Sequence, residues 1–274
     1  MVQKGSTAFA SPQAGQTGVT LLQSRSPSLT AHQIRTTPRR AGSSAFVGVT
    51  ARLRHERLRE MKRLMLGVAA LLGVVANAGE MLDAPPRSPD PQVHYVIYLH
   101  GAIVTGSNGR PVSEHFGPYE YRAILERLAA PGVTVISEIR QDDADEAANV
   151  RRVVAWIDAL QRGGVPSRRI AVIGASLGGI IAARVSQAVA NPDIRYVLLA
   201  STYRMKSIEP FPLHGHVLAI HDEADARDWI AHEYFKNSPD LSSSRQIITQ
   251  TGLGHALLYQ PHDAWVVPAL EWIR

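Results

Sequence analysis

The chain has 274 residues and no cysteine, and its 29 Lys and Arg against 24 Asp and Glu give a formal charge of +5. The lack of cysteine excludes disulfides, a thiol nucleophile and thiolate metal sites. The basic balance alone would favour an anionic partner such as nucleic acid. The charge is uneven, however, because residues 1–60 are net +7 whereas residues 79–274 are net −4.

Residues 1–60 are rich in Ser, Thr, Gln, Gly and Arg and show no sustained hydrophobic period. Such a segment cannot bury enough apolar surface to offset the entropy of ordering it, so we expect a disordered basic extension. Its composition also fits a transit peptide or a nucleic-acid-binding tail. A further hypothesis is that translation starts at Met61 and that these residues belong to an over-long gene prediction.

Residues 61–78 have the layout of a secretory signal peptide. Met61-Lys62-Arg63 supplies a charged start, a 13-residue apolar run follows, and Ala76 and Ala78 place small side chains at −3 and −1 of a cleavage site after residue 78. The apolar run is shorter than the about 20 residues of a membrane span. We therefore predict export to the periplasm or the medium, with no lasting membrane anchor and a mature chain beginning at residue 79.

Residues 79–274 are predicted to form one α/β domain, since short apolar runs alternate with amphipathic segments of helical length. The runs are Val93–Leu99, Val133–Ile136, Ile170–Ile173, Tyr196–Ala200, Val217–Ile220 and Gln246–Thr249. The helical segments are Tyr119–Leu128, Glu146–Leu160, Leu177–Ala190, Asp228–Phe235 and Ala264–Ile273. Near-continuous apolar strands indicate a sheet covered on both faces. The predicted fold is a doubly wound, mostly parallel sheet of about six strands.

Ser176 lies in the most informative motif, Gly174-Ala175-Ser176-Leu177-Gly178-Gly179, which follows an apolar strand and opens a helix rich in small residues. This is the strand–turn–helix setting of a G-x-S-x-G nucleophile, whose tight turn needs small neighbours. The alternative is a glycine-rich turn with a capping serine. A phosphate-binding loop is disfavoured because neither of its glycine spacings occurs.

A serine nucleophile needs a base and an acid that orients the base. His255 follows the last predicted strand on a loop that contains Gly252 and Gly254, and it is the candidate base. Four acidic residues cluster after the preceding strand, and among them Asp225 is the first choice of acid and Asp222 the second.

Two other histidines, His214 and His216, form an H-x-H pair without a clear third ligand. We interpret them as loop and strand-start residues and predict no metal site.

The region 79–274 resembles the α/β-hydrolase superfamily. The order Ser176, Asp225, His255 is that family's order, and Tyr98–Ala102 is similar to its strand followed by an HG oxyanion loop. The resemblance implies that the backbone N–H groups of Ala102 and Leu177 form an oxyanion hole. It brings no particular substrate with it.

The sequence also departs from the larger members of that family. Few residues precede the HG strand, so the first two strands of the usual eight are expected to be missing. Only Ser201–His216 separates a strand from the acid strand, too little for a multi-helix lid. We expect a compact fold with an open site walled by the Ile103–His115 loop and the Tyr203–Phe211 segment. Tyr203, Phe211 and Leu213 are candidate substrate contacts, and the alternative for them is ordinary packing.

Together these features predict an exported serine hydrolase that cleaves a small-molecule ester, or less favourably a thioester or amide, without metal or organic cofactor. Two other classes stay open. One is a non-catalytic exported binding module on the same scaffold, and the other is a nucleic-acid-associated protein that uses the basic tail. Because the predicted mature domain is net acidic, nucleic acid is not its expected partner. The sequence leaves the oligomeric state open.

Overall fold

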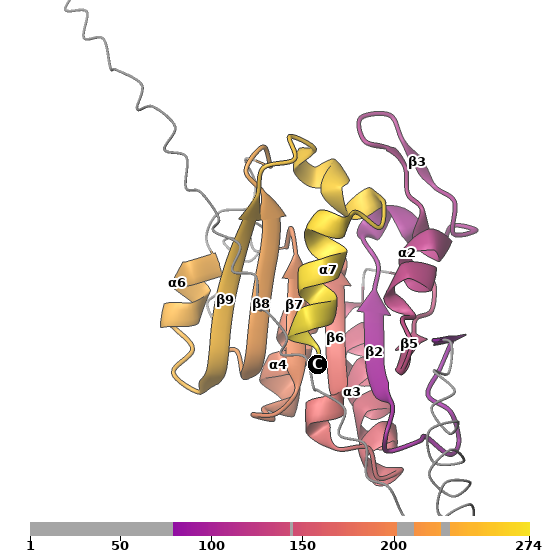
Figure 1. Ribbon diagram of the computed structural model, residues 1–274, viewed down its shortest axis with the longest axis vertical. Coiled ribbons are helices and arrows are strands. Elements are labelled where there is room, and N and C mark those ends of the chain that lie inside the picture. The colour runs from indigo at the N-terminus through magenta and orange to yellow at the C-terminus, as the bar shows by residue number, and fades with distance from the viewer. Residues whose placement is uncertain (1–78, 143–144, 202–210, 226–230) are drawn as a thin grey trace, which may run out of the picture. The chain divides into compact units, whose positions relative to one another are not determined.

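Seven parallel strands form the central sheet of the computed structural model, which describes residues 79–142, 145–201, 211–225 and 231–274 (Figure 1). Their order across the sheet is β1-β5-β2-β6-β7-β8-β9, and every neighbouring pair is parallel. The strands are β1 (Glu80–Leu82), β2 (His94–Leu99), β5 (Val133–Ile136), β6 (Ile170–Ala175), β7 (Arg195–Leu199), β8 (Gly215–Asp222) and β9 (Leu241–Thr249).

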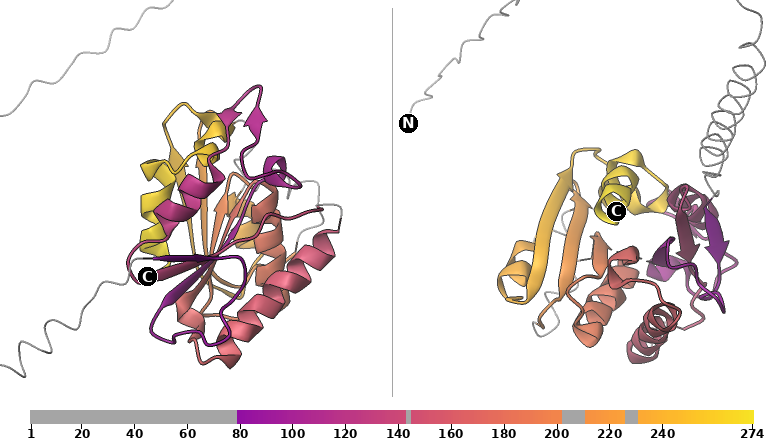
Figure 2. Two further views of the ribbon diagram at one scale, coloured as in Figure 1. Left: turned by 90° about the vertical axis from the view of Figure 1, so that its right-hand side faces the viewer. Right: turned by 60° about the horizontal axis from the view of Figure 1, so that its bottom comes forward.

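Helices cover both faces of this sheet, as the edge-on view in Figure 2 shows. One face carries α2 (Tyr121–Leu128) and α7 (Asp263–Trp272), whereas α3 (Glu146–Arg162) and α4 (Leu177–Val189) pack together on the other. The short helix α6 (Ala231–Lys236) lies against β9. In the described part of the chain, no helix is both long and apolar enough to span a membrane.

Smaller elements complete the edge where the strands end. They are the 3₁₀ helices η1 (Ala102–Val104) and η3 (Gly254–Tyr259) and a two-stranded hairpin of β3 (Val112–Ser113) and β4 (Gly117–Pro118). A third 3₁₀ helix, η2 (Ser167–Arg169), leads into β6. The strand pairing places the residues that follow β2, β6, β8 and β9 along one edge, because parallel strands end on the same side of a sheet.

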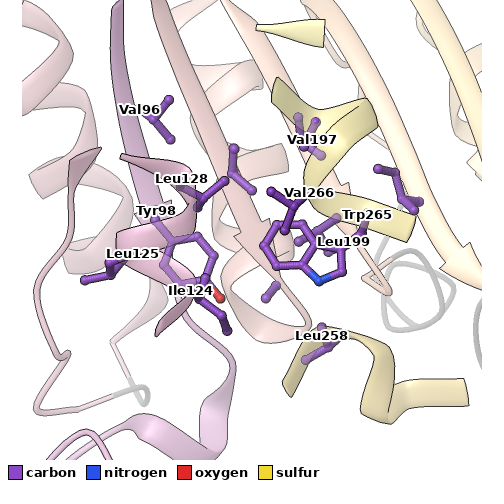
Figure 3. Close-up of a cluster of buried hydrophobic side chains, with 14 of the residues drawn as sticks. Val96, Tyr98, Ile124, Leu125, Leu128, Val197, Leu199, Leu258, Trp265 and Val266 are labelled. Carbon is purple, nitrogen blue, oxygen red and sulfur yellow. The ribbon is translucent and has the colours of Figure 1, made fainter. Parts of the chain in front are cut away.

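One core layer lies between the sheet and α2 and α7 (Figure 3). Tyr98 of β2, Leu128 of α2 and Trp265 of α7 are each at most 1% exposed, and all three belong to this cluster. Burying side chains of this size contributes about 1.5–3 kcal/mol each. The second layer, under α3 and α4, includes Ile157 and Ile181.

The predicted fold class is confirmed, and all six predicted strands are present. The seventh strand, β1, was missed because it has only three residues and one of them is exposed. Strand β9 begins five residues earlier than predicted, since its Leu241–Arg245 portion is mostly exposed and lacks an apolar signal. The first three residues of the predicted helix Asp228–Phe235 lie outside the described residues.

Candidate active site

Ser176 is placed at the turn between β6 and α4 in a backbone conformation that side-chain-bearing residues rarely adopt. Its φ of 51° and ψ of −115° lie outside the common regions, and such a conformation costs about 1–3 kcal/mol. The turn is held by a 2.8 Å hydrogen bond from the Ser176 N–H to the carbonyl of Leu199 on the neighbouring strand. The strained conformation presents the hydroxyl at the edge of the sheet, where it is partly exposed.

Glycines surround this turn because neighbouring backbone atoms and the Ser201 side chain leave no room for a Cβ atom. A Cβ on Gly178 would lie 2.1 Å from the Leu99 carbonyl oxygen, and one on Gly174 would lie 2.3 Å from the Gly178 oxygen. A Cβ on Gly179 would fall 1.7 Å from Oγ of Ser201. Steric exclusion therefore explains why the motif has glycine at all three of these positions.

His255 and Asp225 converge on Ser176 from two other loops. The His255 Nδ1 is 2.6 Å from Oδ2 of Asp225, and its Nε2 is 3.2 Å from Oγ of Ser176. An ionised carboxylate only accepts hydrogen bonds, so Nδ1–H donates to Asp225 and Nε2 is left to accept from the serine hydroxyl. The acid side chain is almost fully buried and that of the histidine is 10% exposed. The structure thus brings together all three residues that the sequence singled out.

Asp222, the second candidate acid, has a different position. Its Oδ2 accepts hydrogen bonds from the Thr249 hydroxyl at 2.8 Å and from the N–H and hydroxyl of Thr251 at 2.8 and 2.7 Å. Its Oδ1 accepts from the N–H groups of Ala224 and Gly254, each at 3.1 Å. This buried carboxylate joins the loop of Asp225 to the loop of His255.

The same contacts determine the ionisation of Asp222. Burial alone would raise the pKa of this carboxyl group, but the hydrogen bonds from Thr251, Thr249 and Gly254 hold the pKa well below its usual range. Asp222 is therefore a charged structural group, and within the described residues its carboxylate makes no hydrogen bond to the His255 ring.

The loop after β2 lies directly beside the serine, since a Cβ on Gly101 would be 3.7 Å from Cβ of Ser176. His100 fixes the next peptide: its Nδ1 donates to the Gly101 carbonyl at 2.9 Å, and its Nε2 accepts from the Arg140 N–H at 2.9 Å. The C=O and N–H of a trans peptide point in opposite directions, so holding the Gly101 carbonyl also orients the N–H of Ala102.

Leu177 is the first residue of α4, and the first N–H groups of a helix have no acceptor within the helix. The two backbone donors that the resemblance implies for an oxyanion hole, on Ala102 and Leu177, thus flank the serine on two separate elements. The positive end of a helix dipole favours negative charge at the N-terminus of the helix, which for α4 lies next to Ser176.

Sequence reasoning missed an aromatic group that supports this edge. The hydroxyls of Tyr98 and Tyr119 are 2.7 Å apart, and the ring of Tyr119 packs 5.0 Å from that of Tyr259. Burial raises the pKa of Tyr119 to about 12, so its hydroxyl stays protonated at neutral pH. Phe116, on the β3–β4 hairpin, lies 5.4 Å from the Tyr259 ring and 5.7 Å from the imidazole of His255. Only the clustering of aromatics between residues 116 and 121 hinted at this group.

The predicted substrate contacts are not supported in the same way. Phe211 is 5% exposed and Leu213 fully buried, and both belong to the core layer on the α3–α4 side. Arg184 stacks 3.8 Å above the Phe211 ring and so helps to enclose it. Both side chains therefore pack in the core of this structure, and a contact of either one with substrate stays a prediction. Tyr203 lies outside the described residues.

A metal site is not formed among the residues that the structure describes, where no three His, Asp or Glu side chains group together. His216 instead places its Nδ1 2.7 Å from the Ser243 hydroxyl.

The fold and this edge define a class of protein: a doubly wound α/β domain with a nucleophile-type serine turn and a facing histidine–aspartate pair. The chain has the fold of the α/β-hydrolase superfamily, as the sequence resemblance implied. No protein-family model matches the sequence, and no curated protein does either.

Several solved structures are similar. Esterase B from Lactobacillus rhamnosis matches at 11% identity over 69% of this chain and 79% of its own, with a TM-score of 0.48. Est1E from Butyrivibrio proteoclasticus, solved with ferulic acid, matches at 14% over 70% and 90%, with a TM-score of 0.44. A protein of the alpha/beta hydrolase superfamily from Xanthomonas campestris matches at 19% over 66% and 95%, with a TM-score of 0.44. At these identities the likeness concerns the fold alone.

Proposed function

We propose that the protein is a serine hydrolase that cleaves a carboxylic ester, or less favourably a thioester or amide, through an acyl-enzyme. The observation that carries this proposal is the continuous relay from Asp225 through His255 to Ser176, at 2.6 and 3.2 Å. A serine–histidine distance slightly above 3 Å is usual in a site without substrate. A non-catalytic binding module gives no reason for three loops to meet in this arrangement.

In the proposed mechanism Ser176 Oγ attacks the ester carbonyl while its proton passes to Nε2 of His255. Asp225 keeps the other ring nitrogen protonated and stabilises the imidazolium. The N–H groups of Ala102 and Leu177 bind the negative oxygen that develops on the carbonyl, and removal of one such donor costs about 10²–10³ in kcat. His255 then gives the proton to the leaving alcohol, and water activated by the same histidine releases the acid.

A fluorophosphonate probe tests this proposal, because it phosphonylates a serine only where the serine is activated. We expect labelling of the wild-type chain at Ser176, to be located by peptide mass spectrometry, and no labelling of Ser176→Ala. Ser201→Ala is a matched control, since that serine hydroxyl is buried and donates to the Leu199 carbonyl. A well-folded wild type that is neither labelled nor active on any short-chain ester would contradict the proposal.

We also propose that the protein is exported and that its working form begins at Gly79. Support comes from the sequence layout of residues 61–78. Intact-mass measurement on the protein recovered from its own host should give the mass of residues 79–274. A recovered chain that still contains residues before Met61 would refute both the export signal and the internal start.

A further inference from the structure

The leaving-group side of the candidate site has a specific wall. In the proposed mechanism His255 Nε2 must reach the leaving oxygen, so the group attached to that oxygen continues past the imidazole ring. The side chain that packs against that ring from the hairpin is Phe116, at 5.7 Å between ring centroids. An alcohol that departs along this side of the imidazole ring would come close to Phe116.

The hairpin holds Phe116 in this position through its backbone and its base. The Ser113 hydroxyl accepts hydrogen bonds from the N–H groups of His115 and Phe116, at 3.3 and 3.2 Å. The ring rests on Tyr259, and β4 contacts η3, the element that carries His255. Figure 1 shows the hairpin beside the loops at the edge where the strands end. Phe116 thus packs against Tyr259 and is half-buried, with part of its side chain open to solvent.

The two described segments beside Phe116 and His255 expose apolar side chains, although the hairpin also carries Glu114 and His115 and Arg110 precedes it. Two of the four large apolar side chains that are exposed in the described residues lie on the two segments that flank His255: Val112 on the hairpin, 70% exposed, and Leu253 on the histidine loop, 39% exposed. Neither residues 112–118 nor residues 250–262 contain Lys or Arg. A carboxylate or phosphate on the leaving group would find no cation on these segments, whereas an apolar ring would find a flat partner.

We propose that Phe116 is a specificity-determining residue that contacts the leaving group, and that the preferred substrates are esters of neutral apolar alcohols, those with an aromatic ring above all. The inference rests on the proposed function and deepens it by naming the alcohol side of the substrate. It places a substrate contact directly after the Ile103–His115 loop, which the sequence analysis predicted as a wall, rather than at Tyr203, Phe211 or Leu213.

The test compares kcat/KM of the full chain for benzyl acetate and ethyl acetate, whose leaving alcohols are similarly basic, with ethyl butyrate to vary the acyl side. Wild type should prefer benzyl to ethyl acetate, and Phe116→Ala should lower that preference by about tenfold. Phe116→Leu should retain part of it. The ratio of ethyl butyrate to ethyl acetate should not change. Glu114→Gln, on the same turn, is the matched control and should behave as wild type.

Three results would overturn the inference. An equal loss on all three esters would mean that Phe116 only supports His255, and a change confined to the acyl-side ratio would place the ring on the other side of the carbonyl. If Phe116→Ala kept the wild-type preference for benzyl acetate, Phe116 would have no role in specificity. Fluorophosphonate labelling separates these results from failure of the proposed function. If wild type is labelled and one of the three results is found, the proposed function stands and the inference is rejected. If wild type shows neither labelling nor turnover, both are rejected. Thermal melting of each variant identifies loss of folding, and Phe116→Leu keeps the test valid if Phe116→Ala unfolds.

Discussion

Replacement of Asp225 by asparagine should lower kcat for ester hydrolysis by about 10⁴-fold while leaving the fold intact. The carboxylate accepts the Nδ1 proton of His255 at 2.6 Å and so reserves Nε2 for the serine hydroxyl. An asparagine amide that turns its NH₂ group toward Nδ1 donates instead of accepting. The imidazole proton then moves to Nε2, which can no longer take the proton of Ser176, and the imidazolium loses its counter-charge.

Steady-state kinetics on a short-chain ester, together with a thermal melt, would measure this effect. Asp225→Glu is an informative partner variant, because it keeps the charge but moves the oxygens by one methylene, and it should retain more activity than the asparagine variant. The sequence left Asp222 as a second candidate for this role. If Asp225→Asn kept activity within a factor of ten of wild type, the assignment of Asp225 as the catalytic acid would be wrong.

The fold was largely readable from the sequence because the central strands are buried on both sides. Strand β6 is buried at every position and β2 at all but its first, so their sequences read as continuous apolar runs. The hydrophobic pattern does not predict the strands at the two edges of the sheet. Edge strands β1 and β9 have one partner each and much solvent contact, so composition does not mark them.

The sequence predicted a candidate site residue where its chemistry also places a steric demand on neighbouring residues. Ser176 was found because its strained turn excludes side chains at the neighbouring glycines, a requirement that local sequence shows directly. Phe116 was not singled out, and Asp222 was named only as an alternative acid, since their roles depend on contacts with residues far along the chain. Phe116 meets a histidine 139 positions away and Asp222 meets residues from Thr249 to Gly254, and no periodicity or motif records such pairings. For the same reason the sequence could not decide whether Phe211, which packs in the core, also contacts substrate.

Replacement of Asp222 by asparagine should lower the free energy of unfolding by at least about 3 kcal/mol at pH 7. Three donors converge on its Oδ2, from Thr249 and Thr251, and an amide NH₂ group in that place would confront them with another donor. Each buried donor left without an acceptor costs about 1–3 kcal/mol. Asp240→Asn is the matched control, because that side chain is exposed and its replacement should have little effect. Urea denaturation followed by circular dichroism measures both.

The pH dependence of that difference follows from the lowered pKa of Asp222. The folded protein keeps this carboxyl group ionised where the unfolded chain, with a pKa of about 3.9, already binds a proton. The unfolded state therefore binds more protons at low pH, so the stability that the carboxylate contributes is fully present above about pH 3.9 and is lost as the pH falls toward the lower folded-state pKa. The gap between wild type and Asp222→Asn should be constant from pH 7 to pH 5 and should narrow below pH 4. A gap that stayed the same down to pH 3 would show that the five hydrogen bonds do not depend on the charge of this carboxylate, and the link between the acid and histidine loops would then be steric rather than electrostatic.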